Sequence, residues 1–149
     1  MTTEWTNPAA CNCLALRQAA RHVSQFYDQF LAPAGLRATQ YAILAKLERE
    51  GPLLIHTLAK ALVMDRTTLG RNILPLQREA LISISPGRVD RRSKELRLTK
   101  AGAERCRAAL KAWRQAQAQF EAAFGRKCAE TLRALLHDVA TNDEITVAV

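Results

Sequence analysis

Two stripes of regularly spaced side chains, one near each end of the chain, constrain the fold most. Their spacings alternate between three and four residues, which is the period of one face of an α-helix. The first stripe comprises Cys13, Leu16, Ala20, Val23, Tyr27 and Phe30, and the second comprises Cys106, Leu110, Trp113, Gln117, Phe120 and Phe124. Such stripes need helical partners, so we expect the two helices to pair across the axis of a dimer. The alternative is that both stripes pack within one chain.

Further helices and a β-hairpin are predicted around these stripes. Helical periodicity extends the striped segments to residues 13–34 and 99–124, and it predicts other helices over 38–50, 54–63, 65–80 and 127–140. Asp65 and Thr99 are the expected N-caps of their helices. The alternating segment 81–85 and the segment 94–98 predict two strands that enclose a charged loop. The fold class is therefore mainly α, with a small β component (α+β).

The positive charge of the chain is concentrated in one block. The 149 residues include 22 Lys and Arg and 14 Asp and Glu, a formal net charge of +8. Twelve basic and five acidic residues lie between Lys60 and Arg107, so about a third of the chain carries +7. A basic block inside a foldable sequence is typical of a surface that binds phosphate groups. The alternative is a solvated basic face without a partner.

Several function classes are excluded by what the sequence lacks. No apolar run is long enough to cross a membrane, and residues 1–8 carry no secretory signal. We therefore expect a cytoplasmic protein with reduced cysteines. The sequence has no phosphate-binding glycine loop, no metal-binding histidine pair and no nucleophile elbow. It predicts no enzyme, no bound metal and no cofactor.

Motifs in and around the basic block resemble those of the MarR family of transcriptional regulators. Asp65-Arg66-Thr67-Thr68-Leu69-Gly70-Arg71 resembles the start of the family's recognition helix, and Asp90-Arg91-Arg92-Ser93 resembles its wing. Leu98-Thr99-Lys100-Ala101-Gly102 is similar to the junction between the wing and the long helix that follows. The matching segments within residues 11–137 are 35–41, 65–76, 80–82, 90–93, 98–102 and 113–117.

The resemblance implies a winged helix-turn-helix with a separate dimerisation region. The DNA-binding lobe would cover residues 36–102, the helical dimerisation region 11–34 and 103–140, and a tail 141–149. The implied function is sequence-specific binding of double-stranded DNA by a homodimer at a palindromic operator. Repression, relieved by a small ligand, is the implied mode of regulation. The remote alternative is a winged-helix module that binds protein and not DNA.

The resemblance also implies which residues contact DNA. The recognition helix would enter the major groove, where Arg71 can pair with guanine, and the wing would reach the minor groove. Asp90 is expected to hold an arginine in place. The predicted DNA contacts are Arg66, Thr67, Thr68, Arg71, Asn72, Asp90, Arg91 and Arg92.

Two modes of regulation follow from the resemblance. Family members commonly respond to small aromatic or anionic molecules, and the candidate ligand residues are Arg17, Arg21, His22 and Trp113. Alternatively, Cys13-Leu14-Ala15-Leu16 resembles the segment of hydroperoxide-sensing members whose cysteine is oxidised. Arg17 stands where those sensors carry a tyrosine, and it could itself lower the pKa of Cys13. The other interpretation of Cys13 is a small apolar residue that fills the stripe.

Overall fold

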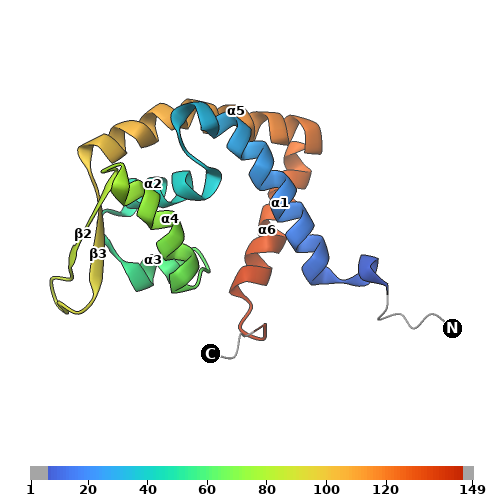
Figure 1. Ribbon diagram of the computed structural model, residues 1–149. Helices are drawn as coiled ribbons and strands as arrows, with labels where there is room; N and C mark the ends of the chain where they lie inside the picture. The colour runs from blue at the N-terminus through green and yellow to red at the C-terminus, as the bar shows by residue number, and fades with distance from the viewer. Residues whose placement is uncertain (1–6, 146–149) are drawn as a thin grey trace.

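Six α-helices and a three-stranded sheet make up residues 7–145, the part of the chain that the computed structural model describes (Figure 1). The helices are α1 (Asn12–Leu31), α2 (Ala38–Glu50), α3 (Ile55–Ala61), α4 (Arg66–Arg78), α5 (Lys100–Phe124) and α6 (Arg126–Thr141). The strands are β1 (Leu53–Leu54), β2 (Ile82–Pro86) and β3 (Lys94–Leu98), and short 3-10 helices cover Pro8–Ala10 and Ala32–Ala34. None of the described helices is long and apolar enough to cross a membrane.

The predicted helices and hairpin are confirmed, with shifts at their ends. The first helix ends at Leu31 because Pro33 lies in the following 3-10 turn. The fourth helix ends at Arg78, and Ala80 adopts a left-handed backbone conformation with φ of 56°. Residues 146–149 of the predicted tail, and residues 1–6 of the segment without a secretory signal, lie outside the described residues.

The sheet contains a strand, β1, that the sequence did not predict. The strand order of the sheet is β1-β3-β2, and both pairs are antiparallel. Leu96 of β3 lies opposite Leu53 of β1 on one side and Ile84 of β2 on the other. Leu96 is fully buried. The sheet closes one end of a core that also takes side chains from α2, α3 and α4: Ile43, Leu44, Leu47, Leu58, Leu69, Ile73 and Leu76.

The two striped helices pack against each other within one chain over part of their length. Tyr27 of α1 donates a hydrogen bond to Gln117 of α5 (2.6 Å), and its ring lies 6.5 Å from that of Phe120. This half of α1 therefore follows the alternative, in which the stripes pack within one chain. In the N-terminal half, the stripe residues Cys13 and Leu16 are exposed.

The long helix α5 connects the two ends of the molecule. In Figure 1 it leaves the sheet, crosses the top of the view and meets α1 and α6 at its far end. Near its middle, Trp113 stacks against Tyr41 of α2 with ring centroids 6.1 Å apart. One helix therefore carries both the sheet end and the helical end of the chain.

Candidate nucleic-acid interface

Helix α4 presents one apolar face and one exposed face. Leu69, Ile73 and Leu76 are buried, and their spacing of four and three residues places them on one side of the helix. Thr67 and Arg71 lie on the opposite side and are exposed. Gly70 lies between them, and a methyl group there would meet no atom within 4 Å. The exposed side of α4 therefore faces solvent.

The N-terminus of α4 is held by Asp65, as predicted. Its carboxylate accepts hydrogen bonds from the backbone N–H of Thr68 (2.8 Å) and from the Thr68 hydroxyl (2.6 Å). These bonds favour the charged form, and they hold the pKa of Asp65 below its usual value of 3.8. The cap therefore fixes the start of the helix that carries Arg66, Thr67 and Arg71.

The five predicted contact residues of α4 fall into two groups. The side chains of Arg66, Thr67 and Arg71 are exposed and make no hydrogen bond to any described residue. Thr68 is engaged in the cap, and the Asn72 amide donates to the backbone carbonyl of Thr68 (2.9 Å). The first group is free to bind a partner, whereas the second already stabilises the helix.

The turn between α3 and α4 contains a strained residue. Val63 has φ of 51°, a left-handed conformation that is costly for a β-branched side chain. The turn is closed by a hydrogen bond from the Met64 N–H to the Ala59 carbonyl (2.9 Å), and the Val63 side chain is 72% exposed. This turn sets the angle between the two helices of the helix-turn-helix.

The hairpin between β2 and β3 ends in a tightly bonded turn, which we call the wing tip (residues 87–93). The Gly87 N–H donates to the Ser93 carbonyl (2.9 Å), and the Ser93 N–H donates to the Asp90 carbonyl (3.1 Å). The Asp90 carboxylate accepts from the backbone N–H of Arg92 (3.0 Å). Asp90, which was expected to hold an arginine in place, thus bonds the backbone N–H of Arg92.

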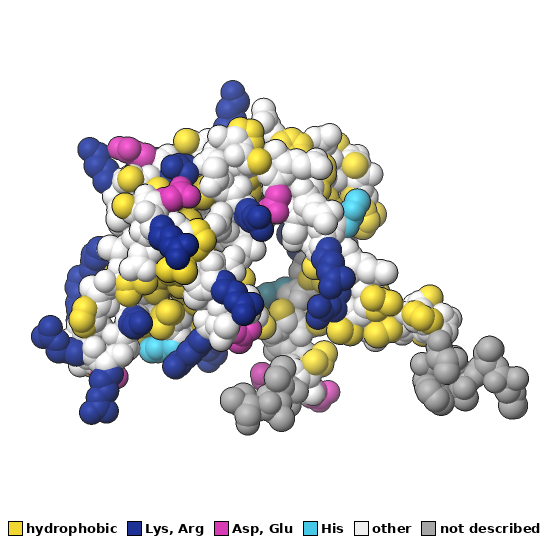
Figure 2. Space-filling view, in the orientation of Figure 1, with side chains coloured by type: hydrophobic (Ala, Val, Ile, Leu, Met, Phe, Trp, Pro, Cys, Tyr) yellow, Lys and Arg dark blue, Asp and Glu magenta, His cyan; other side chains and the backbone are white. Residues whose placement is uncertain are grey.

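The arginines of the wing tip are exposed. Arg91 and Arg92 carry no ion pair with a described residue, and Arg88, which was not among the predicted contacts, is exposed beside them. Figure 2 shows Lys and Arg side chains gathered over the wing and along the lower edge of the lobe. The arginine pattern alone could have indicated Arg88, because it is one of three arginines within five residues.

Thr99 joins the end of the wing to the end of the helix-turn-helix. Its hydroxyl donates to the Ala80 carbonyl (2.6 Å) and accepts from the Gly102 N–H (3.0 Å), which makes it the N-cap of α5 as predicted. Nearby, Arg105 of α5 donates to the Ala34 carbonyl and to Glu79 (3.3 and 3.2 Å). These bonds fix α4, the wing and α5 relative to one another.

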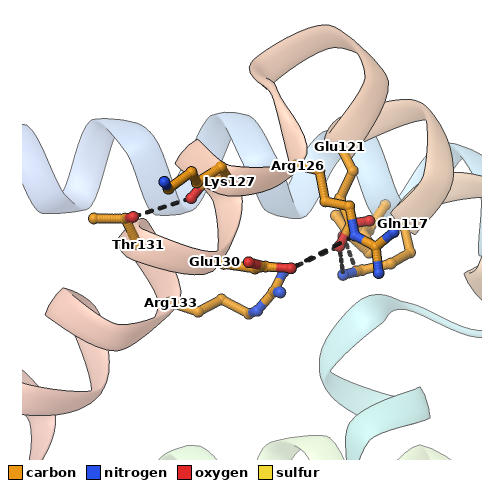
Figure 3. A network of polar contacts seen from close by, with 8 residues as sticks. Gln117, Glu121, Arg126, Lys127, Glu130, Thr131 and Arg133 are labelled. Atoms are coloured by element: carbon orange, nitrogen blue, oxygen red, sulfur yellow. Dashed lines mark hydrogen bonds and ion pairs between the residues drawn. The ribbon is translucent and has the colours of Figure 1, made fainter.

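A second polar network joins helices α1, α5 and α6 at the helical end of the molecule (Figure 3). Glu121 of α5 accepts from Gln117 (3.0 Å) and from Arg133 of α6 (3.2 Å), and Gln117 accepts from Tyr27 of α1 (2.6 Å). Burial raises the pKa of the Tyr27 hydroxyl, and the charge of Glu121 adds to the shift. Tyr27 therefore stays a neutral hydrogen-bond donor.

The four predicted ligand residues are not brought together. Trp113 packs on Tyr41, whereas Arg17, Arg21 and His22 are exposed on the first half of α1. No hydrogen bond, ion pair or ring contact among the described residues joins those three to Trp113. A hollow of about 520 Å³ at the start of α2 is lined by other residues: Asp28, Ala32, Gly35, Leu36, Arg37 and Gln40.

The cysteines differ in their surroundings. Cys13, the predicted redox residue, is exposed, and Cys11 caps α1 by accepting from the Leu14 N–H (3.4 Å). Cys106 is buried, and this burial raises the pKa of its thiol, with the nearby charge of Glu48 adding to the shift. Within residues 7–145, His, Cys, Asp and Glu side chains form no group that could hold a metal ion.

A helix-turn-helix with an exposed recognition face, followed by a basic hairpin, defines a winged-helix protein of the kind that binds DNA. The model of the MarR family matches residues 36–94, which run from the start of α2 to the wing. The Mycobacterium tuberculosis transcriptional regulator MosR, solved in complex with DNA, is 32% identical, with a TM-score of 0.80 over 90% of this chain and 96% of that one. The chain belongs to the MarR family of transcriptional regulators.

Other solved structures share the architecture. A probable transcriptional regulator from Pseudomonas aeruginosa is 28% identical, with a TM-score of 0.76 over 89% of this chain and 99% of that one. BpsR of Bordetella bronchiseptica shares the fold at 20% identity, with a TM-score of 0.80 over 92% of this chain and 98% of that one. No curated protein matches the chain. Membership in a family of regulators agrees with the expectation that the chain is not an enzyme.

Proposed function

We propose that this chain is a homodimeric repressor that binds a palindromic operator in double-stranded DNA and leaves it when a small ligand binds. Residues 36–102 would form the DNA-binding lobe, and residues 11–34 and 103–140 the dimerisation region. The observation that carries the proposal is the exposed side of α4, where Thr67 and Arg71 have no partner among the described residues. The wing arginines extend the same basic surface.

The side chains of α4 would contact the major groove, and those of the wing tip would contact the minor groove. Arg71 can donate two hydrogen bonds to the O6 and N7 atoms of guanine in the major groove, and Thr67 can contact phosphate or a thymine methyl. Arg66 would approach the phosphate backbone, and Arg91 and Arg92 the minor groove. Thr68 and Asn72 would act through the helix, because their polar groups are already bonded.

Replacing Arg71 with alanine tests the assignment. A duplex selected by the wild-type protein from a random pool should bind Arg71→Ala about tenfold or more weakly, and the preference at one base pair should relax. Arg126→Ala is the matched control, since it removes the same charge from α6, where Arg126 is 83% exposed and pairs with Glu130. Equal weakening of Arg71→Ala on selected and random DNA would refute base contact.

The salt dependence of binding separates DNA recognition from a protein-binding winged helix. Each phosphate neutralised by an arginine or lysine releases counterions, so the logarithm of the association constant should fall steeply with the logarithm of the salt concentration. The wild-type protein should show this slope on every duplex. A flat salt dependence would rule out DNA binding and favour the protein-binding alternative.

A second copy of the chain would cover the exposed apolar side chains of the helical end. Leu16 of α1, Phe124 of α5 and Leu135 and Val139 of α6 are each at least 40% exposed. Burying such side chains stabilises an association by about 25 cal/mol per Å². Leu135→Glu should therefore produce monomers in sedimentation experiments, whereas His137→Glu, on the opposite face of α6, should leave the dimer intact. A monomeric wild-type protein at micromolar concentration would contradict the proposal.

Release by a small anionic ligand is the proposed mode of regulation, with Arg17, Arg21, His22 and Trp113 as candidate contacts. BpsR, which shares the fold, is regulated in its DNA binding by 6-hydroxynicotinic acid, a ligand of this class. Aromatic acids should quench the tryptophan fluorescence of the chain and release the selected duplex at the same concentrations. Quenching that persists when Arg17 and Arg21 are both replaced with alanine would remove those arginines from the site.

Oxidation of Cys13 is the second candidate, because Cys13 is exposed and Arg17 follows one helical turn later. A hydroperoxide would oxidise the Cys13 thiolate to a sulfenic acid and be reduced to its alcohol. Peroxide should then release DNA from the wild-type protein but not from Cys13→Ser. Cys106→Ser is the matched control, since burial keeps that thiol protonated. Equal release from Cys13→Ser would end this candidate.

A further inference from the structure

Val89 lies at the apex of the wing tip. It is fully exposed, with a relative accessibility of 102%, which is the highest among the exposed large apolar side chains of the described residues. A single exposed valine on a protein surface would mean little by itself. Here the valine follows Arg88 and precedes Asp90, at the tip of a hairpin whose residues 87–94 carry three arginines and Lys94.

The wing tip is built so that Val89 is held outward. The hydrogen bonds between Gly87 and Ser93 and between Ser93 and Asp90 close the turn beneath it. Gly87 is buried inside the turn, where an added methyl group would overlap the Ser93 hydroxyl and lie 2.5 Å from the Asp90 carbonyl. The turn that carries Val89 is therefore closed by its own hydrogen bonds, and a valine side chain has little rotational freedom to lose on binding.

We propose that Val89 makes the wing selective for A·T base pairs, because its two methyl groups contact the floor of the minor groove. This inference rests on the proposed DNA binding and names what the wing reads there. An A·T pair presents only the acceptors N3 and O2 on that floor, whereas a G·C pair adds the 2-amino group of guanine. A methyl group pressed against that amino group removes its water and offers no acceptor, which costs binding free energy.

The wing arginines do not sense the 2-amino group of guanine itself. Phosphate contacts of Arg88 would carry no direct sequence information. In the minor groove, Arg91 and Arg92 would respond to its width and negative potential, which depend on several successive base pairs and not on one amino group. The one acidic group of the wing tip, Asp90, is bonded to the backbone of Arg92 and faces no base in that role. Val89 is the apolar group at the apex, so it is the part of the wing suited to sense the shape of the groove floor.

Inosine provides a direct test, because an I·C pair equals a G·C pair without the 2-amino group. The probe is the duplex selected by the wild-type protein. Hydroxyl-radical footprinting first identifies the base pairs whose protection depends on Arg91. These base pairs are then replaced by A·T, G·C or I·C. The wild-type protein should bind the A·T and I·C duplexes alike and the G·C duplex about fivefold or more weakly. Val89→Ala should bind all three within about twofold.

Arg88→Ala is the control, since it should weaken all three duplexes equally, lower the salt slope and keep the A·T preference. Full exposure of Val89 means that its replacement should leave the thermal unfolding midpoint unchanged. Salt-dependent binding with equal wild-type affinity for the three duplexes would overturn the inference alone. An unaltered preference in Val89→Ala would overturn it too. Absence of salt-dependent binding to any duplex would overturn the proposed function and this inference together.

Discussion

Replacing Gly102 with alanine should lower the free energy of unfolding by about 2–4 kcal/mol. Gly102 lies in the first turn of α5, against the start of β2. An added methyl group would overlap the carbonyl oxygen of Leu81 and lie 2.7 Å from a methyl carbon of Leu98. The carbonyl belongs to the backbone, so α5 itself would have to move.

The magnitude follows from what that movement breaks. Overpacking of a core contact costs about 1–3 kcal/mol. Shifting α5 also strains the bonds of the Thr99 hydroxyl to the Ala80 carbonyl and the Gly102 N–H, and each is worth about 1 kcal/mol. The higher helix propensity of alanine returns about 1 kcal/mol. The destabilising terms therefore prevail.

Urea unfolding followed by circular dichroism, at one fixed protein concentration, measures the change. Gly70→Ala is the matched control, because it makes the same substitution inside α4 at a position with nothing within 4 Å. It should raise the free energy of unfolding by about 0.5–1 kcal/mol. The packing argument fails if Gly102→Ala lies within about 0.5 kcal/mol of the wild type or if both substitutions shift stability in the same direction.

Three further predictions concern the turn, the cap and the helical end. Val63→Gly should raise the free energy of unfolding by about 1 kcal/mol, because it relieves the left-handed strain of an exposed side chain; an unchanged urea midpoint would contradict this. The pKa of Asp65 is lowered in the folded chain, so its charge stabilises the fold above its unfolded pKa, and this stability is lost as pH falls through the folded pKa. The urea midpoint of the wild type should thus approach that of Asp65→Asn below about pH 4. If the two midpoints instead stay equally far apart down to about pH 2, the charge of Asp65 does not contribute to stability. Tyr27→Phe should cost about 1 kcal/mol in thermal or urea unfolding, because Gln117 loses its 2.6 Å donor, and a neutral result would mean that water replaces the hydroxyl.

The sequence was sufficient to predict elements that depend on local chemistry. Apolar spacing predicted the helices, and the short polar residues Asp65 and Thr99 were correctly identified as N-caps because their side chains satisfy nearby backbone N–H groups. Strand β1 could not be predicted in this way, since its two residues are defined only by pairing with β3. A strand of that length has no periodicity to detect.

Contacts between residues far apart in the sequence could not be predicted either. The stripe of α1 predicts an apolar partner but not whether Phe120 of the same chain or a second copy supplies it. Polar residues of the interface raised the same difficulty. Thr68, Asn72 and Asp90 have the right chemistry to meet DNA, but each is bonded to its own backbone or cap, which only the folded chain shows.

The hydrogen bonds of Thr99 and Arg105 join the lobe to α5, so we expect the two to move as one rigid body. Helix α5 has 25 residues, so its length is about 37 Å at 1.5 Å per residue. A tilt of about 5° at the end that meets α1 and α6 would move the opposite end by about 3 Å. Such a displacement exceeds the tolerance of the hydrogen bond proposed between Arg71 and a base edge. A small movement at the helical end would therefore take α4 out of register with the groove proposed for it.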